Sequence, residues 1–411
     1  MNNTDFFILT RSARIAFIIL YSIANIYAGL VMASLGRYVG DYGFPMSFDI
    51  PIFSLLALVL FSYYLVCCPL YNLGVKFKTK KLNVASKNKI IYFGFFVLIL
   101  QLCYFVFNLK TGINSAGASN PEGFTRFIWL LMPVDYIFYI FYIFSRERTP
   151  VFARVNLAVF IISQLSRGWL GWILIVFYIE LCFFFKNKSY IGILKIRNVL
   201  KLGVLLPLMS FLIVLMYLKV IIREALANEN MAILYSAILK LDFNVVITSF
   251  VDAVFFRLQQ LSNVVFAYEN SYVIEHLLQT NRIASFYWEG LLSQTISKLI
   301  NINPGDDIHV FLYSYFVNSN AVTETTLQTG FVSWFFFDAY TSIIYVIYTT
   351  LLIFISIYLS KKTRFSEVQS LTWFFVFLYL MNGWFVSFLF YIQALIFVCL
   401  FVNVSFKKVR T

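Results

Sequence analysis

The sequence predicts an all-α polytopic integral membrane protein with about ten transmembrane helices and one large helical loop. Hydrophobic residues make up 61% of the 411 residues, and charged residues only 12%, roughly half the share of about 25% in a soluble domain. Apolar runs close to the roughly 20 residues that cross a bilayer recur along the chain. The spans are predicted to be helices, because an open sheet edge would leave unpaired backbone groups in lipid.

Ten segments are predicted to span the membrane. They are 13–35, 51–70, 90–109, 124–144, 151–166, 168–185, 200–221, 330–359, 369–383 and 385–404. The last two can also be interpreted as one helix kinked at Asn382-Gly383. Seven spans therefore occupy residues 1–221 and three occupy 330–411, and the long loop, residues 222–329, separates them.

The distribution of Lys and Arg predicts the orientation, because cytoplasmic connections collect positive charge. With the N-terminus in the cytoplasm, the connections on that side hold 22 of the 32 Lys and Arg residues. Those connections are 1–14, 71–89, 145–154, 186–201, 360–368 and 405–411. Both termini are therefore predicted to be cytoplasmic and the long loop to lie outside. The first apolar run is long enough to be a span rather than a cleavable signal peptide.

Several function classes are disfavoured by what the sequence lacks. All five cysteines fall in predicted spans, so no disulfide is expected in the long loop. Two histidines and no CxxC spacing argue against a metal site, and the sequence has no P-loop or dinucleotide-binding turn, so no cofactor is expected. The basic residues form no concentrated face for nucleic acid. The absence of internal repeats argues against a transporter.

The long loop is predicted to be partly helical. Residues 245–268 and 284–300 have helical spacing of apolar residues, and 271–279 form a third helical piece after Asn270-Ser271. Amphipathic helices of this kind lie on or dip into a leaflet. A turn is predicted at 303–307, where the sequence reads Asn-Pro-Gly-Asp-Asp.

Arg167 is the first candidate site residue, in Ser166-Arg167-Gly168 at the outer end of a predicted hairpin. It is either an anchor that snorkels to the interface or a guanidinium that contacts a phosphate group near the outer leaflet. Asp135 lies within the fourth predicted span. An ionisable group there marks a functional site or a buried partner of a neighbouring Arg or Lys.

Arg223, Arg257 and Arg282 are the arginines of the long loop. Each is part of a solvated face or of a local salt bridge or, if folding brings them together, part of a positive cluster. His309 and His276 are the two groups whose ordinary pKa is near neutrality, so either is a candidate general base. Asp307 lies two residues from His309 and is positioned to orient its ring, and Glu324 is the alternative carboxylate base.

With these features, the chain resembles the bacterial O-antigen or capsule repeat-unit polymerases (Wzy type), which are related to the O-antigen ligases. The resemblance is one of architecture over nearly the whole chain: the number of spans, the Ser166-Arg167-Gly168 hairpin, and one late external loop with scattered arginines. It implies a bacterial inner-membrane glycosyltransferase with a large periplasmic loop. The implied substrates are undecaprenyl-diphosphate-linked oligosaccharides, with membrane lipid and a polysaccharide chain-length regulator as partners.

The resemblance also implies roles for the candidate residues, by position in the topology. Arg167, Arg257 and Arg282, with Arg223, would neutralise the charge that develops on the leaving diphosphate, without a metal. His309, or else Glu324 or His276, would activate the acceptor hydroxyl. Two alternatives remain open at this point: an O-antigen ligase, which differs only in its acceptor, and a flippase for lipid-linked oligosaccharides.

Overall fold

The computed structural model describes most of the chain. The described residues are 3–40, 44–47, 49–79, 87–111, 128–129, 131–167, 171–187, 235, 252, 255–256, 258–289, 293, 296–297, 299–316, 328–363 and 365–405. Within these residues every regular element is a helix, and the pairing outside helices is limited to two isolated bridges, Arg37 with Pro45 and Ile283 with Asp306. The prediction of an all-α fold is confirmed for this part of the chain.

Four described helices are long and apolar enough to cross a membrane. They contain the stretches Ala13–Leu35, Ile52–Lys76, Asn88–Thr111 and Ala339–Lys362. Shorter apolar helices cover Val134–Ser145, Pro150–Ser166, Gly171–Phe184 and Phe385–Phe401. The protein is therefore membrane-embedded, and eight of the ten predicted spans contain a described apolar helix. Of the other two, 369–383 is described below, and 200–221 lies outside the described residues.

The chain forms two compact units. Unit 1 comprises residues 1–46 and 181–262, and unit 2 comprises 47–180 and 263–411. In unit 1, α1 (Asn3–Leu35) buries a stripe of side chains three or four residues apart, the spacing of one helix face. These residues are Ala13, Phe17, Tyr21, Ala24, Ala28 and Met32.

One polar side chain of α1 organises a later segment of unit 1. Asn25 Oδ1 accepts hydrogen bonds from the backbone N–H groups of Gln260 and Leu261, both at 3.0 Å. These groups stand at the start of α12 (Leu261–Glu269), where a helix leaves its first N–H groups without internal partners. The prediction of one continuous helix over 245–268 is therefore wrong at Gln259-Gln260, because Asn25 caps a new helix there.

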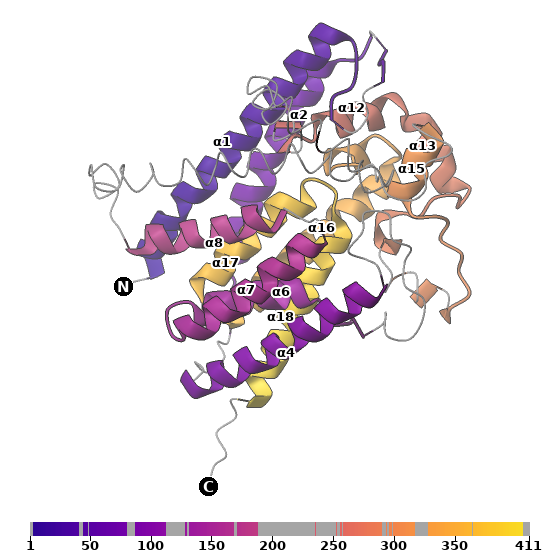
Figure 1. Ribbon diagram of the computed structural model, residues 1–411. Coiled ribbons are helices and arrows are strands. Elements are labelled where there is room, and N and C mark those ends of the chain that lie inside the picture. Colours follow the sequence, from indigo (N-terminus) through magenta and orange to yellow (C-terminus); the bar gives the residue numbers. More distant parts are fainter. Residues whose placement is uncertain are drawn as a thin grey trace. The chain divides into compact units, whose positions relative to one another are not determined.

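Unit 2 holds the other apolar helices. They are α2 (Ile52–Leu65), which continues through the π-helical turn η1 (Val66–Leu70) into α3 (Tyr71–Lys76), then α4 (Lys87–Thr111), α6 (Val134–Ser145), α7 (Pro150–Ser166), the first part of α8 (Gly171–Asn187), α16 (Ala339–Lys362), α17 (Ser366–Phe375) with the π-helical turn η5 (Val376–Leu380), and α18 (Phe385–Ser405). Helix α4 packs against α6 and α7, α18 packs against α6, and α16 packs against α3, α17 and α18 (Figure 1).

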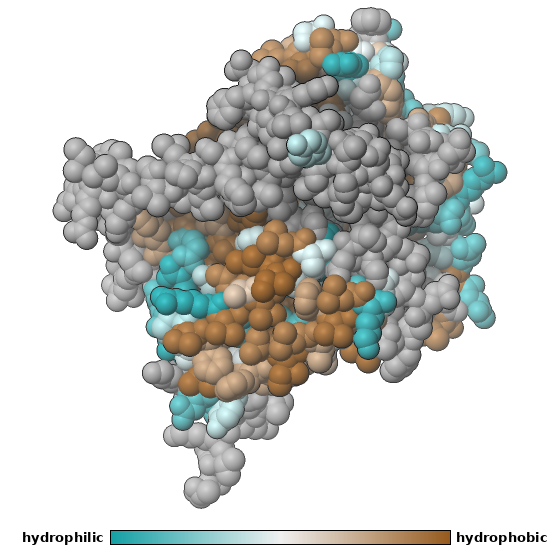
Figure 2. All heavy atoms as spheres, in the orientation of Figure 1, coloured by the Kyte–Doolittle hydropathy of each residue, from teal (hydrophilic) through white to brown (hydrophobic). Residues whose placement is uncertain are grey.

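The outward faces of the unit 2 helices are apolar. On α4 the exposed large side chains recur every three or four residues, which defines a single stripe. They are Tyr92, Phe95, Ile99, Leu102, Val106 and Leu109. Figure 2 shows a continuous hydrophobic surface over the lower part of the view, where Figure 1 places α4, α6 and α7. A contiguous apolar face of this kind marks contact with a membrane.

Three connections that the sequence assigns to the cytoplasmic side contact one another in unit 2. Lys361 Nζ donates hydrogen bonds to the carbonyl oxygens of Val75, at 2.7 Å, and Phe77, at the end of α3. The Arg148 guanidinium lies 5.0 Å from the ring centre of Phe365. Connections 71–89, 145–154 and 360–368 are thus brought together, as expected if they share one side of the bilayer.

The eighth predicted span begins later than the sequence indicates. Helix α16 starts at Ala339 rather than at residue 330, and Val332–Phe335 instead form a short 3-10 helix, η4. Asp338 explains the boundary, because its side chain accepts a hydrogen bond from the Thr341 N–H at 2.8 Å and caps the helix.

The ninth and tenth predicted spans are two helices rather than one kinked helix. The helical turn η5 ends at Leu380, residues 381–384 form a turn, and α18 begins at Phe385. Gly383 has a φ of +81°, and a Cβ there would lie 2.7 Å from the backbone nitrogen of Gly330. The glycine therefore ends the first helix and permits close approach of the segment that enters α16.

In the long loop, the helix predicted over 271–279 is confirmed as α13 (Ser271–Gln279). The helix predicted over 284–300 is wrong at its start. Ala284 lies outside any helix and donates its N–H to the Asp306 carbonyl at 2.7 Å, and a 3-10 helix, η3 (Phe286–Trp288), follows. A further helix, α15 (Ile308–Phe316), follows the turn at 303–307.

Candidate functional site

The structure places four of the seven predicted site residues. His309 and Arg167 are buried, whereas His276 on α13 and Arg282 are exposed. Arg223, Arg257 and Glu324 lie outside the described residues. The candidate site is therefore built around the buried histidine, in unit 2.

His309 forms a buried pair with Glu289. The ring nitrogen Nε2 of His309 lies 3.1 Å from Oε2 of Glu289, and the two side chains are 8% and 0% exposed. A hydrogen bond of this length between an imidazole and a carboxylate favours the tautomer in which Nε2 carries the proton. The contact with Glu289 thus fixes both the tautomer and the orientation of the His309 ring.

Each partner is held by its own element. His309 is the second residue of α15, and its N–H donates to Oδ1 of Asp307 at 3.0 Å, which fixes the start of that helix. Glu289 directly follows η3, which Phe286 anchors. The ring centre of Phe286 lies 5.0 Å from that of Trp334 and 5.1 Å from that of Tyr345, and all three side chains are fully buried. The packing of Phe286 against Trp334 and Tyr345 therefore places Glu289, three residues later, in the interior.

Burial determines the electrostatics of Glu289. Loss of solvation raises the pKa of its carboxyl above the ordinary value, while His309 opposes this shift and Asp307 adds to it. The second oxygen, Oε1, is buried and has no hydrogen-bond partner in the described part of the chain. A buried carboxylate in this state is stabilised by any positive charge that appears beside it, and a protonated His309 supplies such a charge.

A glycine fixes the turn that precedes His309. Gly305 has a φ of +88°, and a Cβ there would lie 2.6–2.8 Å from backbone atoms of Asn281, Arg282 and Ile283. Beside it, the Asp306 N–H donates to the Arg282 carbonyl at 3.0 Å. The structure therefore brings Arg282 to the turn that leads into His309, although the two residues are far apart in sequence.

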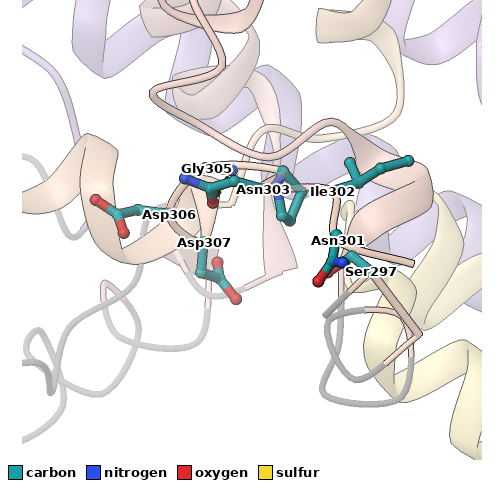
Figure 3. A pocket seen from close by; sticks show the side chains of 8 residues that line it. Ser297, Asn301, Ile302, Asn303, Gly305, Asp306 and Asp307 are labelled. Carbon is teal, nitrogen blue, oxygen red and sulfur yellow. Dashed lines mark hydrogen bonds between the residues drawn. The ribbon is translucent and has the colours of Figure 1, made fainter. Parts of the chain in front are cut away.

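A polar hollow of about 540 Å³ lies on this turn. Its lining residues are Ser297, Asn301, Ile302, Asn303, Pro304, Gly305, Asp306 and Asp307. Figure 3 shows the side chains of Asp307 and Asn301 directed to the same side of the turn, whereas Asp306 points away from both. Among the described lining residues, Asp307 supplies a carboxylate on that side of the turn, and Ser297, Asn301 and Asn303 supply further polar side chains. Such groups can form hydrogen bonds with a ligand that carries many hydroxyl groups.

Arg167 belongs to a second cluster, where α6 begins and α7 ends. Its Nη2 lies 2.9 Å from Oδ1 and 3.0 Å from Oδ2 of Asp135, and its guanidinium carbon lies 5.2 Å from the centre of the Tyr104 ring. The Arg167 side chain is 1% exposed. The interpretation of Asp135 as the buried partner of an arginine is therefore confirmed. A phosphate contact by Arg167 requires this ion pair to open.

Glu289 is the site residue that sequence reasoning missed. A carboxylate commonly lies on the surface, and its partner is twenty residues away. The signal was local, because Glu289 ends the run Phe286-Tyr287-Trp288, and an acid attached to consecutive aromatic residues is drawn into the interior with them. Among the described residues, no group of three or more His, Cys, Asp or Glu side chains is placed to hold a metal ion.

Comparison with known proteins adds no relative: no family model, curated protein or solved structure matches this chain.

Proposed function

We propose that this protein is a membrane glycosyltransferase that polymerises lipid-linked oligosaccharide repeat units at the periplasmic face of a bacterial inner membrane. The substrates would be undecaprenyl-diphosphate-linked oligosaccharides, as in the O-antigen or capsule polymerases that the chain resembles. The observation that carries the proposal is the Glu289–His309 pair, a buried acid–base pair within a membrane-embedded helical protein.

The reaction requires a base and a stabilised leaving group. His309 would take the proton of an acceptor sugar hydroxyl while its oxygen attacks the anomeric carbon of the donor. The bond from that carbon to the diphosphate oxygen breaks, and undecaprenyl diphosphate leaves with the electron pair. The new glycosidic bond joins the donor glycan to the acceptor. The donor already carries a good leaving group, so the step needs no nucleotide.

Cationic side chains would stabilise the departing diphosphate. Arg282 is exposed and linked through its backbone to Asp306, three residues before His309. Arg257 and Arg223 are proposed for the same role on the basis of the resemblance. Arg167 would join them only in a state in which Asp135 releases it.

The polar hollow is proposed to receive the acceptor glycan. Asp307 lines the hollow, and the same side chain accepts the backbone N–H of His309. An acceptor bound there would lie next to the base, because Asp307 contacts the backbone of His309. Ligand pockets span about 300–1,000 Å³, and the hollow, at about 540 Å³, falls in this range.

The test is a deletion of the gene in the source strain, followed by separation of the surface glycan on a gel. We expect core carrying a single repeat unit in the deletion strain and a full ladder after complementation with the wild type. His309→Ala should fail to restore the ladder at normal protein level. His276→Ala is the matched control, because His276 is exposed on α13, and should restore it.

Other outcomes identify the alternatives. Full-length polymer on the lipid carrier with none on core would show a ligase, and repeat units accumulating on the cytoplasmic side would show a flippase. Restoration of the ladder by His309→Ala but not by His276→Ala would move the base to α13.

A further inference from the structure

The carboxylate of Glu289 is fully buried and contacts the proposed base, His309. Burying an ionisable group is costly unless the group is paired. The pairing is incomplete among the described residues, since Oε2 contacts His309 and Oε1 has no hydrogen-bond partner there. A carboxylate kept in such surroundings is expected to serve the histidine beside it.

We infer that Glu289 is a positioning residue for the transfer reaction, which fixes the orientation of the His309 ring through Nε2 and stabilises the imidazolium that forms when His309 takes the proton of the acceptor hydroxyl. This inference rests on the proposed function, in which His309 is the base. Glu289 would act through His309 and would not contact the substrate itself.

The geometry supports two effects of Glu289. The 3.1 Å contact selects one tautomer and one orientation of the ring, since a carboxylate can only accept a hydrogen bond. The negative charge also stabilises the imidazolium that forms as His309 takes the proton. That attraction arises during the reaction and is absent when the ring is neutral, so it lowers the barrier rather than only binding the ground state.

The surroundings of Glu289 strengthen both effects. Among the described residues, the titratable groups that face it besides His309 are Asp307 in the turn before α15 and the phenols of Tyr345 and Tyr348 on α16. Of these described groups, His309 is the one that can carry a positive charge, because carboxyls and phenols are either neutral or negative. The carboxylate therefore gains most of its electrostatic compensation when His309 is protonated.

The experiment measures elongation of lipid-linked repeat units by membranes containing each variant, as a function of pH. The probe is the lipid-linked repeat unit extracted from the deletion strain. Glu289→Gln should lower the rate roughly a hundredfold. It should also move the acidic limb of the pH profile to lower pH, since loss of the anion makes His309 easier to deprotonate. Glu289→Asp keeps the charge and should leave the limb in place.

Two controls separate positioning from a structural role. Glu275→Gln makes the same chemical change on α13, where Glu275 is only partly buried and contacts Gln279, and should leave rate and profile unchanged. The double variant Glu289→Gln/His309→Ala should be no slower than His309→Ala alone, because the effects of substituting two residues that act as one unit do not add.

The inference is overturned if Glu289→Gln leaves the acidic limb where it is in the wild type, or if its loss of rate adds to that of His309→Ala. Failure of the proposed function looks different. In that case wild-type membranes would not elongate the repeat unit at all, whatever residue occupies position 289.

Discussion

Arg167, which is buried, and Asp135, which is partly buried, form an ion pair in which one guanidinium nitrogen, Nη2, lies within 3.0 Å of both carboxylate oxygens. The pair joins the last turn of α7 to the first turn of α6, and the ring of Tyr104 from α4 covers the guanidinium. Three helices of unit 2 therefore meet at one arginine. These contacts give Arg167 a structural role, and its proposed role in binding diphosphate needs a test that is independent of stability.

Arg167→Ala should destabilise the protein, because it leaves the Asp135 carboxylate without its partner. Breaking a buried pair from one side costs about 3–5 kcal/mol. We expect a clear fall in the melting temperature of the detergent-solubilised protein and less protein in the membrane. Asp135→Ala should also destabilise the protein, since it removes the carboxylate that contacts the buried Arg167 guanidinium.

A paired replacement separates stability from binding. Arg167→Met with Asp135→Leu removes both charges and should recover most of the stability lost in either single variant. If the stable double variant still restores the glycan ladder, Arg167 has no part in binding diphosphate. A stable protein that fails to restore it supports that part of the proposal.

Asp307→Asn should weaken binding of the acceptor glycan. The change removes a charge from the hollow but keeps the oxygen that accepts the His309 N–H, so the start of α15 is preserved. Losing one charge-assisted hydrogen bond should raise the KM for the acceptor roughly tenfold. Elongation rates at increasing acceptor concentration measure this.

Asp306→Asn is the matched control for the hollow. Its side chain is exposed and points away from Asn301 and Asp307 (Figure 3), so the same loss of charge should leave the KM near that of the wild type. Equal effects of the two variants would show that the overall charge of the turn matters, and that the hollow does not hold the acceptor.

The spans were predictable because hydropathy is a property of the sequence. Crossing a bilayer needs a long apolar run, and such runs were found wherever α2, α4 and α16 lie. Helix boundaries were less predictable, because specific side chains set them. Asp338 delays the start of α16, and Asn25 starts α12 from a helix more than two hundred residues earlier. A cap supplied from a distant part of the chain leaves no local pattern.

The candidate site was predictable only in part. His309 stood out because a histidine titrates near neutrality and follows a clear turn. Its partner did not, because the approach of Glu289 depends on how the Phe286 ring packs and how Gly305 fits against Arg282. Arg167 was identified, but the sequence alone could not show that Asp135 engages it.

Gly305→Ala should disrupt the turn that leads into the site. The new Cβ would overlap backbone atoms of Asn281 and Arg282, and the φ of +88° is one that alanine adopts only with strain. We expect a cost of roughly 2–4 kcal/mol and loss of the ladder. The readouts are the melting temperature of the purified protein and the complementation gel.

Gly171→Ala is the control for that substitution. Gly171 begins α8, and a Cβ there would have no atom of the described residues within 4 Å. Alanine favours a helix over glycine, so the control should be as stable as the wild type and should restore the ladder. A Gly305→Ala protein that is equally stable and restores the ladder would contradict the close backbone packing of Gly305 against Arg282.

The stability of the protein should fall with rising pH because of Glu289. Burial raises the pKa of this carboxyl above its ordinary value of 4.5, so the folded state holds the proton more tightly than the unfolded state does. The resulting stabilisation is complete below pH 4.5 and is lost as the pH rises through the raised pKa. The Glu289→Gln variant has no ionisable group at this position, so it lacks this dependence of stability on pH. Melting temperatures measured between about pH 4 and pH 8 should therefore show the melting temperature of the variant rising relative to that of the wild type as the pH increases.

Glu275→Gln, with its melting temperature measured over the same range, controls for the loss of one carboxylate that is not fully buried. If the difference between Glu289→Gln and the wild type is constant with pH, or changes in the opposite direction, the Glu289 carboxyl is not held in the desolvated state that the structure shows.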